Sequence, residues 1–100
     1  MDIDRFNASL AVRHPPAGLS ALLEALWYDG HGDWERAHNI VQRQEGKDAA
    51  AVHAYLHRKE GDLSNADYWY LRAQRARTSV PLADEWRDLV VLLIACDAPE

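Results

Sequence analysis

The fold of this chain is indicated by a turn sequence that occurs twice. Residues 61–66 read Gly61-Asp62-Leu63-Ser64-Asn65-Ala66, and residues 32–37, 29 positions earlier, read Gly32-Asp33-Trp34-Glu35-Arg36-Ala37. Both stretches have glycine, aspartate, a hydrophobic residue, two variable positions and alanine. Glycine ends a helix in a left-handed conformation, aspartate caps the next helix, and alanine lets two helices approach closely. Each copy therefore predicts the turn of an antiparallel helical hairpin.

The segments around these turns have the periodicity of amphipathic helices. No stretch alternates between apolar and polar residues as a strand does. The expected helices cover residues 20–29 with Ser20 as N-cap, 34–45 after Asp33, 49–60 after Asp48, 63–77 after Asp62 or Ser64, and 82–96 after Pro81. The sequence therefore predicts an all-α fold of two antiparallel helical hairpins and a C-terminal apolar helix.

Residues 1–18 differ from the rest because they show no sustained helical period. They end in the pair Pro15-Pro16, which forbids a helix and favours an extended backbone. We expect residues 1–18 to form an extended N-terminal arm, and residues 19–97 to form a single helical domain.

The second turn and the helix after it resemble tetratricopeptide-like helical hairpins. The positions that match are Gly61, Ala66, Tyr70 and Ala73 in the second copy, and Gly32, Ala37 and Val41 in the first. The period of 29 residues is shorter than the ~34 of that family, and two copies are fewer than a solenoid needs. The strings at 27–42 and 52–70 are also similar to small bacterial proteins, a likeness that brings no activity with it. The resemblance implies a module that acts through protein contacts.

Composition excludes several classes of function. The net charge of −5 disfavours non-specific binding to DNA or to an anionic membrane. The longest apolar run, Leu89 to Cys96, is much shorter than the roughly 20 residues of a membrane span. With one cysteine and an acidic N-terminus that lacks the apolar region of a secretory signal, the chain is expected to be cytoplasmic. We expect neither a nucleic-acid nor a membrane partner.

Two histidines one helical turn apart give the sharpest chemical signal. His53 and His57 lie four positions apart, Glu60 follows, and His38 lies on the preceding expected helix. Imidazoles at this spacing can hold one metal ion, but the pattern lacks the glutamate of a zinc-peptidase helix. Glu60 is also about 10 Å along the helix axis from His53, too far for the two to share an ion easily. The alternative interpretation is a set of buried, hydrogen-bonded histidines.

Partner binding is the favoured function, and catalysis is not expected, because the sequence has no phosphate loop, nucleophile elbow or Cys–His pair. The residues expected to contact a protein or peptide partner are His53, Tyr55, His57 and Arg72. No cofactor is expected in this interpretation. The alternative is a metal- or small-molecule-binding protein, including a hydrolytic one, that uses His38, His53, His57 and Glu60.

The apolar C-terminal helix raises the question of a homodimer. Its apolar residues cover opposite sides, and a helix that is apolar all round is buried all round. In a chain of 100 residues such a helix either lies at the centre of the fold or meets a second copy. The residues expected at the contact between copies are Leu89, Val91, Leu92 and Ile94.

Aromatic side chains are numerous for a chain of this length. Those on the apolar stripes are expected to fill the core, and the others to be exposed and available for contact. The first group is Trp27, Trp34, Trp69 and Tyr70, and the second is Tyr28, Tyr55 and Tyr68.

Overall fold

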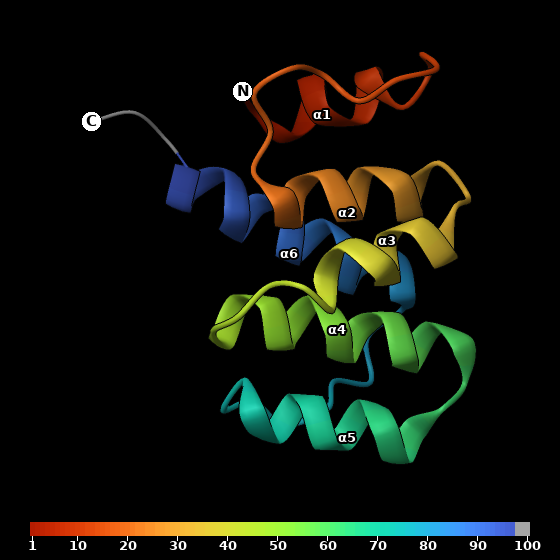
Figure 1. Cartoon of the computed structure of the whole chain (residues 1–100), viewed down its shortest axis with the longest axis vertical. Coiled ribbons are helices and arrows are strands. Elements are labelled where there is room, and N and C mark those ends of the chain that lie inside the picture. The colour runs from red at the N-terminus through yellow and green to blue at the C-terminus, as the bar shows by residue number, and fades with distance from the viewer. Residues whose placement is uncertain (98–100) are drawn as a thin grey trace.

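The computed structural model of the chain describes residues 1–97, which form six helices and no strand. The helices are α1 (Ile3–Ser9), α2 (Ala21–Gly30), α3 (Trp34–Val41), α4 (Lys47–Glu60), α5 (Leu63–Arg72) and α6 (Leu82–Asp97). Helix α2 packs against α3 and α4 packs against α5, and both pairs run antiparallel (Figure 1). Helix α6 contacts α1, α2 and α4. The all-α prediction is therefore confirmed, and among the described helices none is long and apolar enough to cross a membrane.

Local capping signals place most helix starts where the sequence predicts them, but α3 ends at Val41 rather than residue 45 and α5 at Arg72 rather than residue 77. The side chains that cap a helix as expected are Ser20 at α2, Asp33 at α3 and Asp62 at α5. Gly61 ends α4 with φ +89° and ψ 7°, a left-handed conformation that favours glycine. Helix α4 differs at its start, because it begins at Lys47 after Gly46, with no capping side chain, rather than after Asp48.

The N-terminal segment corrects the prediction of an extended arm. Residues Ile3–Ser9 form α1, and Phe6 is fully buried with its ring centroid 5.7 Å from that of Trp86 in α6. The hydroxyl of Ser9 accepts a hydrogen bond from Trp27 Nε1 at 3.1 Å. The segment has the apolar residues Ile3, Phe6 and Leu10 at i, i+3 and i+7, all packed on the core, but this stripe spans too few residues to form a sustained period. Helix α1 therefore covers part of the core that α6 and α2 would otherwise expose.

Helix α4 is the most enclosed element of the fold. Every residue from Ala49 to His57 is buried, and α4 contacts α2, α3, α5 and α6. Helix α6, which the sequence predicts to be apolar all round, buries Leu89, Val90 and Leu93 but leaves Val91 45% exposed. Alanine-rich α4 takes the central place because its small side chains let neighbouring helices approach from several sides.

Two buried carboxylates connect α4 to its neighbours. Asp29 in α2 accepts a hydrogen bond from Tyr55 Oη at 2.6 Å and pairs with Lys59 Nζ at 2.9 Å. Glu85 in α6 is bound in the same way, by Tyr70 Oη at 2.5 Å and by Arg58 Nη1 at 2.9 Å. A buried charge is strongly destabilising unless it is paired and hydrogen-bonded. Each carboxylate therefore restricts how α2 or α6 can sit against α4 and α5.

Both phenols in these two networks are held in the donating form. Burial raises the pKa of Tyr55 and of Tyr70 well above the ordinary value, and the hydrogen bond to Asp29 or Glu85 raises it further. Each tyrosine therefore keeps its proton at neutral pH and donates a hydrogen bond to the carboxylate.

We expect the substitution Tyr55→Phe to lower the free energy of unfolding by about 1–3 kcal/mol, because it leaves one oxygen of buried Asp29 without its donor. Urea denaturation followed by circular dichroism measures this loss. The control is Tyr68→Phe, which removes the hydroxyl of a side chain that is 53% exposed and leaves stability unchanged. Equal effects of the two substitutions would contradict a structural role for the Tyr55–Asp29 pair.

Candidate metal centre

Three histidines from α3 and α4 meet on the side of α4 that faces α3 and α5. His38 Nε2 lies 3.1 Å from His53 Nε2, and one ring nitrogen from each of His38, His53 and His57 lies within 4.8 Å of the other two. His53 and His57 are each 6% exposed, and His38 is half-buried. The fold thus brings together the three histidines that the sequence singled out.

Two tryptophans hold the imidazole rings in place. Trp34 stacks on His38 at a centroid distance of 5.0 Å, and Trp69 stacks on His53 at 3.9 Å. The indole of Trp34 is itself anchored, because its Nε1 donates to the carbonyl of Leu56 at 2.8 Å. The tryptophans limit the rotation of the rings, so the nitrogens stay directed toward one another.

Both tryptophans are expected from the sequence to fill the core, and that expectation misses their contact with the histidines. Trp34 precedes His38 by four residues, a spacing that places them on one face of α3 and could have shown their contact. Trp69 belongs to another helix, α5, and its position against His53 has no local signal in the sequence.

Glu60 supports the cluster from one side and is not part of the group formed by the three imidazoles. Its Oε1 lies 2.6 Å from His57 Nδ1, one turn further along α4. This agrees with the expectation that Glu60 is too far along the axis to share an ion with His53. A histidine that ligates a metal commonly donates its other N–H to a carboxylate, which fixes the tautomer and the ring orientation. Glu60 therefore leaves Nε2 of His57 as the nitrogen free to face the other two rings.

Two of the three histidines, His38 and His53, are shifted toward the neutral form. Burial, together with repulsion from His57 and His38, lowers the pKa of His53 to about 4. Burial also lowers the pKa of His38, as does His57, whereas Glu60 acts in the opposite direction. The neutral imidazole is the form that binds metals, and in that form one of the two Nε2 atoms donates to the other across 3.1 Å.

We expect the free energy of unfolding of the metal-free protein to fall as the pH decreases from 6.5 toward 4. Unfolded His53 takes up a proton below the ordinary histidine pKa of 6.5, whereas folded His53 stays neutral until about pH 4. The unfolded state therefore binds more protons in this window, and acid favours it. Urea midpoints at a series of pH values measure the slope.

The matched variant is His53→Gln, which cannot take up a proton. Its stability should vary less with pH over the same window than that of the unchanged chain. Parallel curves for the two proteins would contradict the lowered pKa of His53.

The expected partner surface is not formed as the sequence predicts. His53, Tyr55 and His57 are 6%, 2% and 6% exposed, so Arg72 is the one member of the set that a partner can reach. The expectation that Tyr55 is exposed is wrong, because its hydroxyl is used by buried Asp29. Tyr68 is exposed as predicted, at 53%, and Tyr28 is half-buried.

The residues expected to join two copies of the chain are divided between core and surface. Leu89 is 2% exposed within the single chain, so its assignment to self-association is corrected. Leu92 and Ile94 are half-buried, and Val91 is 45% exposed. Helix α6 directs Leu89 into the core because α2 and α4 pack against that face.

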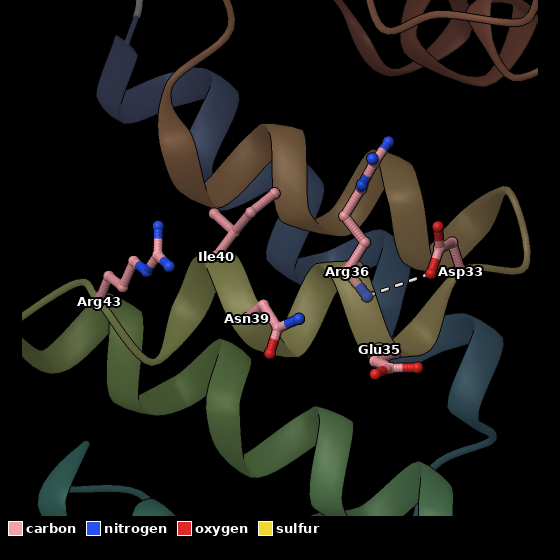
Figure 2. Close-up of a pocket in the computed structure, with 6 residues that line it drawn as sticks. All are labelled: Asp33, Glu35, Arg36, Asn39, Ile40 and Arg43. Atoms are coloured by element: carbon pink, nitrogen blue, oxygen red, sulfur yellow. Dashed lines mark hydrogen bonds between the residues drawn. The ribbon is translucent and has the colours of Figure 1, made fainter.

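A pocket of about 350 Å³ lies along the outer side of α3, away from the cluster. Its residues come from α3 and the turns beside it, and Figure 2 shows their side chains spread along the helix. The carboxylate of Asp33 caps α3 by accepting a hydrogen bond from the backbone N–H of Arg36. The guanidinium of Arg36 lies 4.8 Å from the ring centroid of Tyr28. Since a single helix supplies this lining, no set of functional groups converges there.

No protein-family model, curated protein or solved structure matches the chain. The likeness to tetratricopeptide-like hairpins therefore depends on the quoted residues, and the function is argued from the geometry of the histidine cluster.

Proposed function

We propose that this chain binds one transition-metal ion, with zinc as the best-fitting metal, through His38, His53 and His57. The observation that supports this is the convergence of three imidazole nitrogens within 4.8 Å of one another. In a tetrahedral zinc site with Zn–N bonds of about 2.0–2.1 Å, neighbouring nitrogens lie about 3.3–3.4 Å apart. The separation of 3.1 Å between His38 and His53 is close to that spacing, and one ring nitrogen of His57 lies within 4.8 Å of both.

The chemistry of the donor set also favours this assignment. Imidazole nitrogens suit zinc, copper and nickel, whereas calcium and magnesium require oxygen ligands. Three histidines leave one coordination position for an exchangeable ligand, as in zinc sites that act on a bound molecule. Glu60 at 2.6 Å from His57 Nδ1 supplies the carboxylate that commonly supports a ligating histidine.

The experiment is zinc titration of the untagged protein by isothermal calorimetry, with metal content measured by mass spectrometry. We expect one zinc per chain. The substitution His38→Ala removes a ligand that is half-buried on α3, and should weaken zinc binding by more than the ~10–100-fold that loss of a supporting residue such as Glu60 costs. The control is His14→Ala, which removes an exposed histidine outside the cluster and leaves binding unchanged.

Circular dichroism establishes whether each variant keeps its helices. Sub-stoichiometric zinc on the unchanged chain, or equal affinity of the folded His38→Ala and His14→Ala proteins, would overturn the proposal.

We also propose a second function, binding of a protein partner by tetratricopeptide-like hairpins, on a surface other than the one first expected. Helix α5 leaves Leu71 77% exposed and Tyr68 53% exposed, with exposed Arg72 beside them. Tyr68 and Leu71 are three residues apart on α5, so their exposed side chains share one face of the helix. The antiparallel packing of α4 against α5 supports the hairpin part of this proposal.

Cross-linking tests the second function. A photoreactive amino acid in place of Leu71 should give one discrete product, and the product should disappear when Tyr68→Ala is added. The same label in place of Gln42, exposed at the end of α3, is the control. A product of twice the mass of the chain would identify the partner as a second copy, and equal labelling from both positions would contradict a specific surface.

A further inference from the structure

A second pocket, of about 470 Å³, opens beside the histidine cluster. It lies between the start of α4 and the second half of α5, and His53 forms the wall that it shares with the cluster. The polar or aromatic residues of its lining that matter here are Glu45, Lys47, His53, Trp69 and Arg72. The pocket therefore combines groups from two helices with one of the three clustered histidines.

His53 offers one unused nitrogen to this pocket. Its side chain is more than nine-tenths buried, and its Nε2 is occupied by His38 at 3.1 Å. Within residues 1–97 its Nδ1 has no hydrogen-bond partner. Every fully enclosed side-chain nitrogen or oxygen of this part of the chain does have a partner. The Nδ1 atom is therefore not fully enclosed, and His53 lines the pocket. His57 differs, because its Nδ1 already contacts the carboxylate of Glu60.

Two cations, Lys47 and Arg72, line the same pocket without a carboxylate partner of their own. Neither Lys47 nor Arg72 forms an ion pair with any residue of the described chain. The guanidinium of Arg72 is held in place by the rings of Trp69 and Tyr68, at 5.3 and 5.6 Å from their centroids. The one carboxylate of the lining is that of exposed Glu45, so the lining has an excess of positive charge.

The first turn of α4 adds backbone donors to the same pocket. The first backbone hydrogen bond of α4 runs from Ala50 N–H to the carbonyl of Gly46, at 3.0 Å. The N–H groups of residues 47–49 therefore have no partner within the helix, and no side chain caps them. These donors lie at the positive end of the helix dipole, which favours an anion.

We propose that this pocket binds the oxyanion group of a small molecule, a carboxylate or a phosphate, with His53 Nδ1, Arg72 and Lys47 as its side-chain donors. The anion would accept a hydrogen bond from Nδ1 of His53, just as the carboxylate of Glu60 contacts Nδ1 of His57. Arginine and lysine supply charge-assisted hydrogen bonds to such a group, and the indole edge of Trp69 supplies apolar contact to the rest of the molecule.

If the chain binds zinc as proposed above, His53 couples the affinity for the anion to the affinity for the metal. A metal ion on Nε2 of His53 places the remaining ring proton on Nδ1, where it becomes a donor to the anion. Zinc and the anion should then each increase the affinity for the other by the same factor.

The experiment uses inorganic phosphate and succinate as probes, titrated separately into the metal-free full chain and followed by ¹H–¹⁵N nuclear magnetic resonance. We expect one probe to bind saturably and to shift the backbone signals of residues 47–49 and the ring signal of His53. The probe that binds more tightly identifies the ligand group as a phosphate or a carboxylate. Arg72→Gln and Lys47→Gln should each weaken this binding by about tenfold or more, as expected for the loss of a charge-assisted hydrogen bond.

The matched control is Arg87→Gln, which removes an exposed arginine of α6 outside this pocket and leaves the affinity unchanged. The proposal is overturned if neither probe saturates, or if Arg87→Gln weakens binding as much as Arg72→Gln does. The His38→Ala protein separates this proposal from the metal site, because it loses a zinc ligand and keeps the pocket lining. Phosphate or succinate binding that persists in His38→Ala supports the anion pocket whether or not zinc binds the unchanged chain.

Discussion

The pairing of two buried carboxylates with groups on α4 and α5 is the constraint on which the arrangement of the helices depends. Asp29 comes from α2 and Glu85 from α6, and both would be strongly destabilising in the interior without a partner. Tyr55 and Lys59 satisfy the first, and Tyr70 and Arg58 satisfy the second. Hydrophobic burial alone is non-directional, whereas these hydrogen bonds have one geometry that satisfies all their atoms. They therefore specify which faces of α2 and α6 meet α4.

Helix α4 presents its histidines on the side away from these carboxylates. This arrangement explains how a chain of 100 residues can hold an ordered cluster. His53 and His57 lie on the most buried segment of the fold, and His38 is brought to them by the packing of α3 on α4. Trp34 and Trp69 then limit the rotation of the rings. A site on rigid helices with fixed side chains needs little reorganisation when it binds an ion.

His53 links the two proposed sites through its two nitrogens. Its Nε2 lies 3.1 Å from that of His38 in the cluster, and its side chain lines the pocket between α4 and α5, where we propose that Nδ1 meets an anion. Protonation and metal binding at one nitrogen of an imidazole determine whether the other nitrogen donates or accepts a hydrogen bond. One side chain can therefore transmit the occupancy of one site to the other without movement of the backbone.

The sequence by itself determined the features that depend on neighbouring residues. These are the helical class, the capping turns at Asp33 and Asp62, the glycine stop at Gly61 and the one-turn spacing of His53 and His57. Only the tertiary structure decided that α1 enters the core, that α4 and not α6 is central, that Tyr55 is buried, and that Trp69 covers His53. The physical reason is that a cap or a helical period is encoded within a few residues. A contact between helices instead depends on which of many apolar faces pack together and on where a buried charge finds its partner.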